Sequence, residues 1–173
     1  FILTFQVNYE PFMFENNNTR TELSSLGEFG LIKHIRKHVL LNNKSTICGI
    51  GDDAAVIKYS EGKQTVVSAD MLIEGVHFDL TYCPLKHLGY KAVSVNVSDI
   101  YAMNASPRQI LVSIAISNRF SLEAIEELYA GMLIACKRFD VDLVGGDTSS
   151  SKTGMVINIT VIGEADKNEI IYR

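Results

Sequence analysis

The chain has 173 residues, of which 47% are hydrophobic and 21% are charged. These fractions are those of an ordinary globular domain, which excludes intrinsic disorder and collagen-like structure. Sixteen lysines and arginines stand against twenty aspartates and glutamates, a net charge of −4, and the basic residues are scattered along the chain. An acidic chain without a basic cluster does not favour nucleic-acid binding, so nucleic acid is not an expected partner.

The chain has three cysteines: Cys48, Cys83 and Cys136. They form no CxxC pair, and an odd number cannot all close into disulfides within one chain, which favours a reducing, cytoplasmic setting. The longest apolar stretches, 1–7 and 155–163, are much shorter than the roughly 20 residues of a membrane helix, so we expect no membrane partner. Residues 1–22 lack the pattern of a secretory signal, and we expect them to be a poorly ordered extension.

The first half of the chain predicts two helices separated by a hairpin. Residues 25–41 begin with the S-x-x-E form of a capping box and continue with apolar residues at helical spacing. Short apolar runs at 54–57 and 65–69 flank a turn-like, glycine-containing sequence, which predicts a β-hairpin. Between residues 84 and 104 apolar positions recur every three to four residues, which predicts the second helix.

The second half predicts strands on both sides of a third helix. Residues 109–117 alternate between apolar and small or polar positions, as in a half-buried strand. Ser121 is a typical N-cap for a helix that extends to Phe139, and strands follow at 141–144 and 153–163. This order predicts one α+β domain over residues 23–173, in which a mixed, mostly antiparallel sheet packs with helices in two layers.

The positions of the aspartates are the most informative chemical feature. Carboxylates occur beside apolar or glycine-rich segments: Asp52, Asp53, Asp70, Asp99 and Asp147. Carboxylates gathered at the ends of core elements need a cation to neutralise them, and oxygen ligands that share a nucleotide are typical of Mg²⁺. Each aspartate alone is also typical of a turn or a helix cap, so the hypothesis rests on the whole set. Gly145 and Gly146 beside Asp147 allow a phosphate to approach the backbone closely.

Other motifs fit less well. The segment Gly49–Gly51 loosely matches a dinucleotide fingerprint, but that motif must open a helix, and a hairpin is expected here. His34 and His38 have helical i, i+4 spacing, but Ile35 replaces the glutamate of HExxH, which favours a solvated helix face over zinc. His77 follows a strand, where it either contacts a ligand or bonds nearby backbone. No covalent nucleophile is indicated.

Four motifs in series carry a resemblance to a known family: Gly49–Ala55 (GIGDDAA), Ser68–Phe78 (SADMLIEGVHF), Gly89–Met103 (GYKAVSVNVSDIYAM) and Val144–Thr148 (VGGDT). Their order and spacing resemble the amino-terminal, ATP-binding domain of thiamine-monophosphate kinases. That superfamily includes aminoimidazole ribonucleotide synthetase and selenophosphate synthetase. The resemblance covers residues 23–173 and implies the fold of that domain, with a homodimer formed by sheet-to-sheet packing.

The resemblance implies Mg²⁺-dependent transfer of the γ-phosphoryl group of ATP to thiamine phosphate, giving thiamine diphosphate and ADP. Such transfer depends on positioning and charge neutralisation, so a site without a protein nucleophile suffices. The family continues past Arg173 into a second domain with a further metal and substrate site, so the chain is expected to correspond to the amino-terminal half. The alternatives are another synthetase of the superfamily and a non-catalytic module that binds nucleotide or dimerises.

The resemblance also implies roles for single residues. The metal-binding positions are Asp52, Asp53, Ser68, Ala69, Asp70, Asp99 and Asp147. Ala69 stands where the family often has threonine or serine, so only its backbone carbonyl could serve. The ATP-binding positions are Tyr129, Gly145, Gly146, Asp147 and Arg173. His77 corresponds to a contact with thiamine phosphate.

Overall fold

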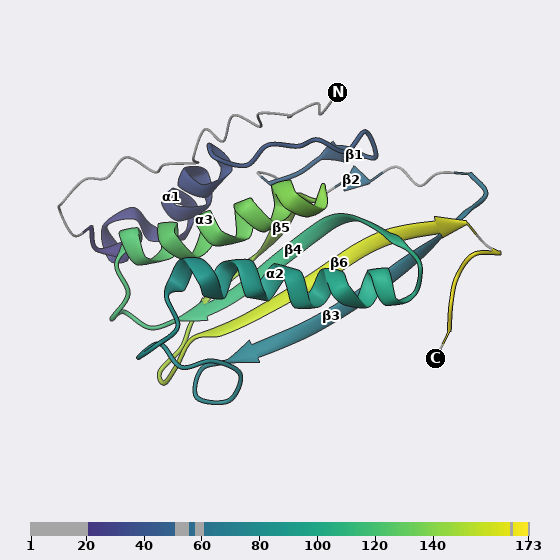
Figure 1. Cartoon of the computed structure of the whole chain (residues 1–173). Helices are drawn as coiled ribbons and strands as arrows, with labels where there is room; N and C mark the ends of the chain where they lie inside the picture. The colour runs from purple at the N-terminus through teal and green to yellow at the C-terminus, as the bar shows by residue number, and fades with distance from the viewer. Residues whose placement is uncertain (1–20, 51–55, 58–60, 167, 173) are drawn as a thin grey trace, which may run out of the picture.

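The structure is a computed structural model that describes residues 21–50, 56–57, 61–166 and 168–172. The helices are α1 (Leu23–Arg36), α2 (Leu85–Ala102) and α3 (Leu122–Phe139). The strands are β1 (Thr46–Cys48), β2 (Val56–Ile57), β3 (Lys63–Ile73), β4 (Ser106–Ile116), β5 (Asp142–Ser150) and β6 (Val156–Asp166). Figure 1 shows α2 and α3 side by side over one face of the larger sheet.

The larger sheet has the strand order β3-β6-β4-β5. Strand β6 is antiparallel to both of its neighbours, β3 and β4, whereas β5 is parallel to β4. The parallel pair is joined through α3, because a parallel neighbour cannot be reached by a tight turn. The expected fold class, a mixed and mostly antiparallel sheet packed with helices, is confirmed.

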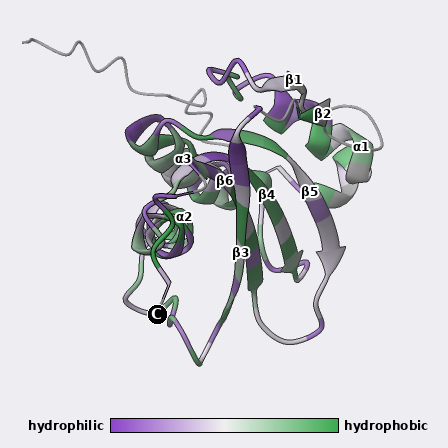
Figure 2. Cartoon of the chain, turned by 90° about the vertical axis from the view of Figure 1, so that its right-hand side faces the viewer, coloured by the Kyte–Doolittle hydropathy of each residue, from purple (hydrophilic) through white to green (hydrophobic). Residues whose placement is uncertain are grey.

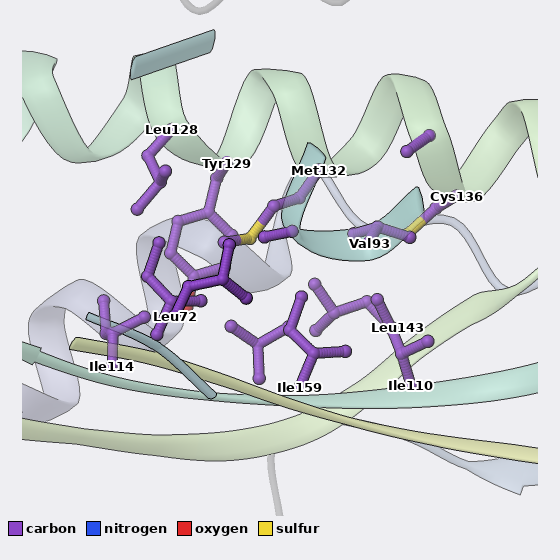
Figure 3. Packing of buried hydrophobic residues seen from close by; sticks show 14 of the residues in the cluster. Leu72, Val93, Ile110, Ile114, Leu128, Tyr129, Met132, Cys136, Leu143 and Ile159 are labelled. Carbon is purple, nitrogen blue, oxygen red and sulfur yellow. The ribbon is translucent and has the colours of Figure 1, made fainter. Parts of the chain in front are cut away.

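The core lies between this sheet and the helices α2 and α3. Alternate side chains of β4 and β6 point toward the helices, and Ile110, Ile157 and Ile159 are fully buried there. The amphipathic face of α3 supplies Leu128 and Met132 from above, as Figure 3 shows. Apolar residues thus recur every second position in the strands and every three to four positions in the helices, and each element buries the face on which they lie. The sequence patterns predict this arrangement.

The opposite face of the sheet is not covered by α2 or α3, as Figure 2 shows. Strand β3 exposes apolar side chains there at alternating positions, and Val67, Met71 and Ile73 are 60%, 51% and 37% exposed. Apolar side chains gathered in this way on a sheet face are typical of an interaction surface. We call this the outer face of the sheet.

Two local predictions are wrong. Among the described residues, the pairing predicted between 54–57 and 65–69 is not formed, because β2 pairs with β1 and the long strand β3 pairs instead with β6. Residues 54, 55 and 58–60 of the predicted hairpin lie outside the described residues. Helix α1 starts at Leu23, earlier than the predicted Ser25, without a side-chain cap at Glu22, and Gly27 has a positive φ of 64° inside it. The Glu28 side chain of the predicted capping box lies outside the described residues. Helix α1 ends at Arg36 rather than Leu41, where exposed leucines offer nothing to bury.

Helices α2 and α3 and strands β4 and β6 agree with the sequence-based expectations, whereas strand β1 (Thr46–Cys48) was not predicted. Helix α2 begins after Pro84, and the Ser121 hydroxyl accepts a hydrogen bond from Ala124 N at 3.4 Å at the start of α3. Strand β5 is longer than the predicted 141–144, because it continues through the glycine pair beside β4. Among the described helices, none is long and apolar enough to cross a membrane.

Candidate functional site

Polar side chains gather where the edge strand β3 runs beside α2. The hydroxyl of Ser68 donates a hydrogen bond to Asp99 Oδ2 at 3.0 Å. One turn earlier on α2, Asn96 Oδ1 accepts a hydrogen bond from the backbone N–H of Asp70 at 2.8 Å. Asn96 is fully buried, and its amide also donates to Ala92 O at 2.9 Å. These contacts hold β3 and α2 in one register and bring Ser68, Asp70 and Asp99 to the same edge.

The carboxylates at this edge fit a hydrated divalent cation. Asp70 and Asp99 are exposed, and across the described part of the chain neither forms an ion pair. The described residues contain no group of three or more His, Cys, Asp or Glu side chains close enough to hold a metal alone. Mg²⁺ usually takes one or two carboxylates and keeps several waters, so this donor set suits Mg²⁺ rather than an all-protein cage.

His77 lies in the loop that follows β3, at the other end of the α2 edge. Its Nδ1 accepts a hydrogen bond from the backbone N–H of Ile73 at 3.0 Å. In the neutral ring this contact leaves the proton on Nε2, so the exposed side of the ring is a donor. Lys91 of α2 donates to the carbonyl of His77 at 2.8 Å. The two alternatives for His77, a ligand contact and a hydrogen bond to nearby backbone, are therefore compatible. The ring accepts from the backbone through Nδ1 and can still donate through Nε2.

The glycine pair of β5 permits a close strand contact. Gly146 has a φ of +150°, and a Cβ atom at this position would overlap the carbonyl of Val112 on β4. Gly145 has more room, since the nearest atom to a Cβ there is Leu111 Cδ2 at 3.8 Å. Only a residue without a side chain fits at 146, so this part of β5 keeps its backbone against β4.

The register of the sheet separates Asp147 from Asp70. Asp147 pairs with Ser113 of β4, which pairs with Asn158 of β6, and this row belongs to the outer face. Asp70 pairs with Ile159, whose side chain is buried on the helix side. Three strand spacings, about 14 Å, lie between β3 and β5. A single chain therefore does not bring Asp147 to the Ser68, Asp70 and Asp99 group.

Of the remaining predicted site residues, the structure describes Tyr129 and Ala69. Tyr129 is only 4% exposed, in the core between α3 and the sheet, and burial raises the pKa of its phenol. The contact of Tyr129 with ATP stays a prediction. Ala69 is exposed on β3. Asp52, Asp53 and Arg173 lie outside the described residues.

Several residues of this region were not predicted from the sequence. Asn96 is a polar residue on the otherwise apolar face of a predicted helix, and that break in the pattern is the signal that could have found it. Lys91 carries no such signal. Arg119 and Glu74 form an ion pair between segments far apart in the sequence, which spacing alone does not reveal.

His34 of α1 and His38, just beyond its end, make structural contacts. His34 Nε2 lies 2.7 Å from Glu126 Oε1 of α3, and His38 Nδ1 lies 3.1 Å from His34 O. The predicted solvated face is thus half-buried against α3. A histidine beside one carboxylate is not a zinc site, which agrees with the lack of an HExxH motif.

Comparisons with known proteins agree with the motifs. Thiamine-monophosphate kinase of Bacillus subtilis is 40% identical over 148 residues, which is 86% of this chain and 45% of the relative. That of Aquifex aeolicus is 37% identical over 145 residues, 84% of this chain and 44% of the relative. The chain therefore spans about half the length of the curated relatives that it matches.

Solved structures give the same result. A crystal structure of thiamine-monophosphate kinase from Stenotrophomonas maltophilia matches with a TM-score of 0.71 and 32% identity, over 84% of this chain and 45% of that chain. A structure of AaThiL complexed with AMPPCP and TMP matches with a TM-score of 0.60 and 35% identity, over 90% of this chain and 46% of that chain. A likeness to hydrogenase maturation protein HypE, at 22% identity and a TM-score of 0.62, shows the fold alone.

A family model described as AIR synthase related protein, N-terminal domain, matches residues 51–165. That span contains the whole of the four-stranded sheet except the last residue of β6, together with α2 and α3. The chain therefore belongs to the family of AIR synthase related proteins and carries their N-terminal domain.

Proposed function

We propose that this chain is the nucleotide- and Mg²⁺-binding half of a thiamine-phosphate kinase. The reaction is transfer of the γ-phosphoryl group of ATP to thiamine phosphate, giving thiamine diphosphate and ADP. A relative that is 40% identical carries that name, and a 35% identical structure is a complex with AMPPCP and TMP. The observation that carries the proposal is the β3–α2 edge, with exposed carboxylates at one end and His77 with Lys91 at the other.

The two ends of the edge have complementary roles in this proposal. Asp70, Asp99 and the Ser68 hydroxyl hold Mg²⁺, which neutralises charge on the phosphates of ATP when it is bound. His77 donates its Nε2 proton in a hydrogen bond to the phosphate of thiamine phosphate, and the ammonium of Lys91 adds positive charge nearby. The acceptor phosphate attacks directly, so positioning and charge neutralisation account for the chemistry without a protein nucleophile.

The glycine pair and its neighbours complete the nucleotide side of the proposal. Gly145 and Gly146 offer backbone to the phosphates, and Asp147 adds a metal ligand. Asp52 and Asp53 are proposed as further metal ligands, and Arg173 as a nucleotide contact, on the strength of the family resemblance. The free thiol of Cys83 and the buried thiol of Cys136 suit a reducing compartment, and we place the protein in the cytoplasm.

A homodimer is the second part of the proposal. The outer face exposes Val67, Met71 and Ile73 on β3, and packing against the same face of a second chain would bury them.

Calorimetric titration of the full chain with AMPPCP, in Mg²⁺ and again in EDTA, tests the nucleotide site. Binding is expected in Mg²⁺ and is lost in EDTA, because the carboxylates repel the phosphates without a cation. Asp70→Asn lowers the affinity in Mg²⁺, and Asp79→Asn, in the loop before α2, serves as a control. Equal binding with and without Mg²⁺ would refute the shared metal site.

The acceptor is tested separately by ADP release with thiamine phosphate and with the acceptors of the related synthetases. Thiamine phosphate is expected to stimulate release most strongly, because His77 and Lys91 present donors to a phosphate group. Preference for an aminoimidazole precursor or for selenide would assign the chain to another member of the superfamily. Nucleotide binding with no release for any acceptor would favour the non-catalytic module.

A further inference from the structure

An ion pair fixes the start of the loop that carries His77. Arg119, from the connection between β4 and α3, places Nη2 2.5 Å from Oε1 and 2.5 Å from Oε2 of Glu74. Glu74 is the first residue after β3, and its Oε2 also accepts a hydrogen bond from Met155 N at 2.7 Å. The backbone N–H of Glu74 donates to Met155 O at 3.0 Å. Glu74 is therefore held both by Arg119 and by the segment that begins β6.

The rest of the loop is closed by short contacts that start from this anchored residue. Gly75 N donates to Phe78 O at 2.8 Å, and the Phe78 side chain is buried. His77 N donates to Ile73 O at 2.9 Å, while the His77 ring accepts from Ile73 N. The orientation of the imidazole thus depends on the direction in which the chain leaves β3, and that direction is set at Glu74.

The pair has little to do with the stability of the whole domain. The Arg119 side chain is 50% exposed and that of Glu74 is 19% exposed. Exposed ion pairs contribute little to the free energy of unfolding, because solvent screens them and ordering the side chains costs entropy. The effect of removing Arg119 is therefore expected to be local, at the loop that Glu74 begins.

We propose that Arg119, acting through Glu74, is a positioning residue that holds the loop 74–78 so that His77 directs its Nε2–H at the phosphate of thiamine phosphate. The inference rests on the proposed function, and it adds residues to which no substrate role was assigned. Arg119 does not touch the substrate. Its guanidinium is suited to the task because Nη2 contacts both oxygens of the Glu74 carboxylate, which restrains the position of that carboxylate.

The ligand-free chain gives the first test. In ¹⁵N-labelled protein, the His77 ring is expected to show a single neutral tautomer protonated on Nε2. Arg119→Ala is expected to mix the tautomers and to speed amide hydrogen exchange at residues 75–77, with the midpoint of urea unfolding nearly unchanged. The matched control is Arg108→Ala, which removes the 3.2 Å ion pair of Arg108 with Glu164 at the far end of the sheet. A His77 ring and loop unaffected by Arg119→Ala would overturn the proposal.

Titration with thiamine phosphate, followed on the same His77 signals, gives the second test. Loss of a well-directed hydrogen bond to a phosphate weakens binding roughly tenfold or more, so Arg119→Ala is expected to raise the dissociation constant by that factor. Arg119→Lys is expected to recover part of the loss, and Arg108→Ala to cause none. In a His77→Ala background, followed by calorimetry, Arg119→Ala is expected to have no further effect.

The outcomes separate this inference from the proposed function. If the unaltered chain does not respond to thiamine phosphate, the proposed substrate is wrong, and so is the phosphate role of His77. If the unaltered chain binds and Arg119→Ala binds equally well, only the positioning role is wrong. Additive losses from Arg119→Ala and His77→Ala would also overturn it, since Arg119 would then act independently of His77.

Discussion

At the scale of single residues, the backbone at position 146 demands glycine. The φ of Gly146 is +150°, and a Cβ atom would overlap the carbonyl of Val112 on the neighbouring strand. Gly146→Ala is expected to lower the free energy of unfolding by about 3 kcal/mol, as strained positions usually do. Gly145→Ala, where a Cβ meets only Leu111 Cδ2 at 3.8 Å, is expected to cost less than about 1 kcal/mol. Urea unfolding of both variants checks this, and similar losses would contradict it.

Glu123 gives the chain a pH dependence that can be isolated. Burial raises its pKa, but hydrogen bonds to its own backbone, to Ser121 and to Thr21 outweigh burial and lower the pKa from 4.5 to about 2. A carboxyl group with a lowered pKa stabilises the fold above its unfolded pKa, and this contribution disappears as the pH falls from about 4.5 to about 2.

Glu123→Gln is therefore expected to be less stable than the unaltered chain at neutral pH and nearly equal to it below the folded pKa. The difference between the two midpoints of thermal unfolding, measured at several pH values, reports this. Glu127→Gln, on the exposed side of α3, is the control and is expected to change little at any pH. A constant difference for Glu123→Gln across the range would show that the carboxylate charge is not responsible.

At the scale of elements, α2 and α3 pack closely because each contributes a glycine to the crossing. A Cβ atom at Gly89 would overlap the carbonyl of Leu128, and one at Gly131 would overlap the carbonyl of Lys86. In an exposed helix, glycine to alanine stabilises by about 1 kcal/mol. Here the same change is expected to destabilise by about 3 kcal/mol or more, because backbone rather than a flexible side chain must move.

Circular dichroism during urea unfolding measures this loss for Gly89→Ala and Gly131→Ala. Gly30→Ala in α1 is the comparison, since a Cβ there meets only Leu26 side-chain atoms, the nearest at 3.1 Å. A gain in stability for either of the two packed positions would contradict a direct backbone contact between the two helices at these glycines.

Elements with a strong local pattern could be predicted, and pairing between them could not. The helices at 85–102 and 122–139 and the strand at 106–116 bury one regular face each, so their periodicity was sufficient. The hairpin prediction is wrong because β3 pairs with β6, which lies about ninety residues away in the sequence. Nearby turn composition carries no information about such a partner.

The candidate site shows the same division. The sequence motifs indicate Ser68, Asp70 and Asp99 as metal-binding positions, and the structure brings these three residues together at one edge of the sheet. Motif spacing does not reveal that Asp147 lies on the other face of the sheet, because the face on which a side chain lies depends on the register of the strands. Asp142 was not singled out, although it is fully buried and its carboxylate accepts hydrogen bonds from Asn42, Asn43 and Thr46. Its partners are about a hundred residues away, so no local pattern marks it.

At the scale of the whole molecule, one sheet carries the proposed site at two opposite edges. Strand β3 and strand β5 are the two edge strands, with Asp70 on the first and Asp147 on the second. If both aspartates bind the metals of one nucleotide, the partner edge must come from a second chain. In a two-fold dimer each site would then combine Asp70 of one chain with Asp147 of the other.

Mixing two inactive variants tests this arrangement. Asp70→Asn and Asp147→Asn homodimers each lack an intact site, but a mixed dimer has one intact site of two. After unfolding and refolding an equal mixture, about one quarter of the Mg²⁺-dependent AMPPCP sites should return, because half of the dimers are mixed. If both aspartates of a site belong to one chain, no sites return.

The matched control is a chain with both substitutions, refolded with the unaltered chain. When a site is shared between chains, a dimer of unaltered and doubly substituted chains has no intact site, so only the unaltered dimers bind and about one quarter of the sites remain. When a site lies within one chain, every unaltered chain keeps its site and about one half remain. Calorimetric site counts separate these values. A shared site predicts about one quarter of the sites in both mixtures. No sites in the first mixture and about one half in the second would contradict it.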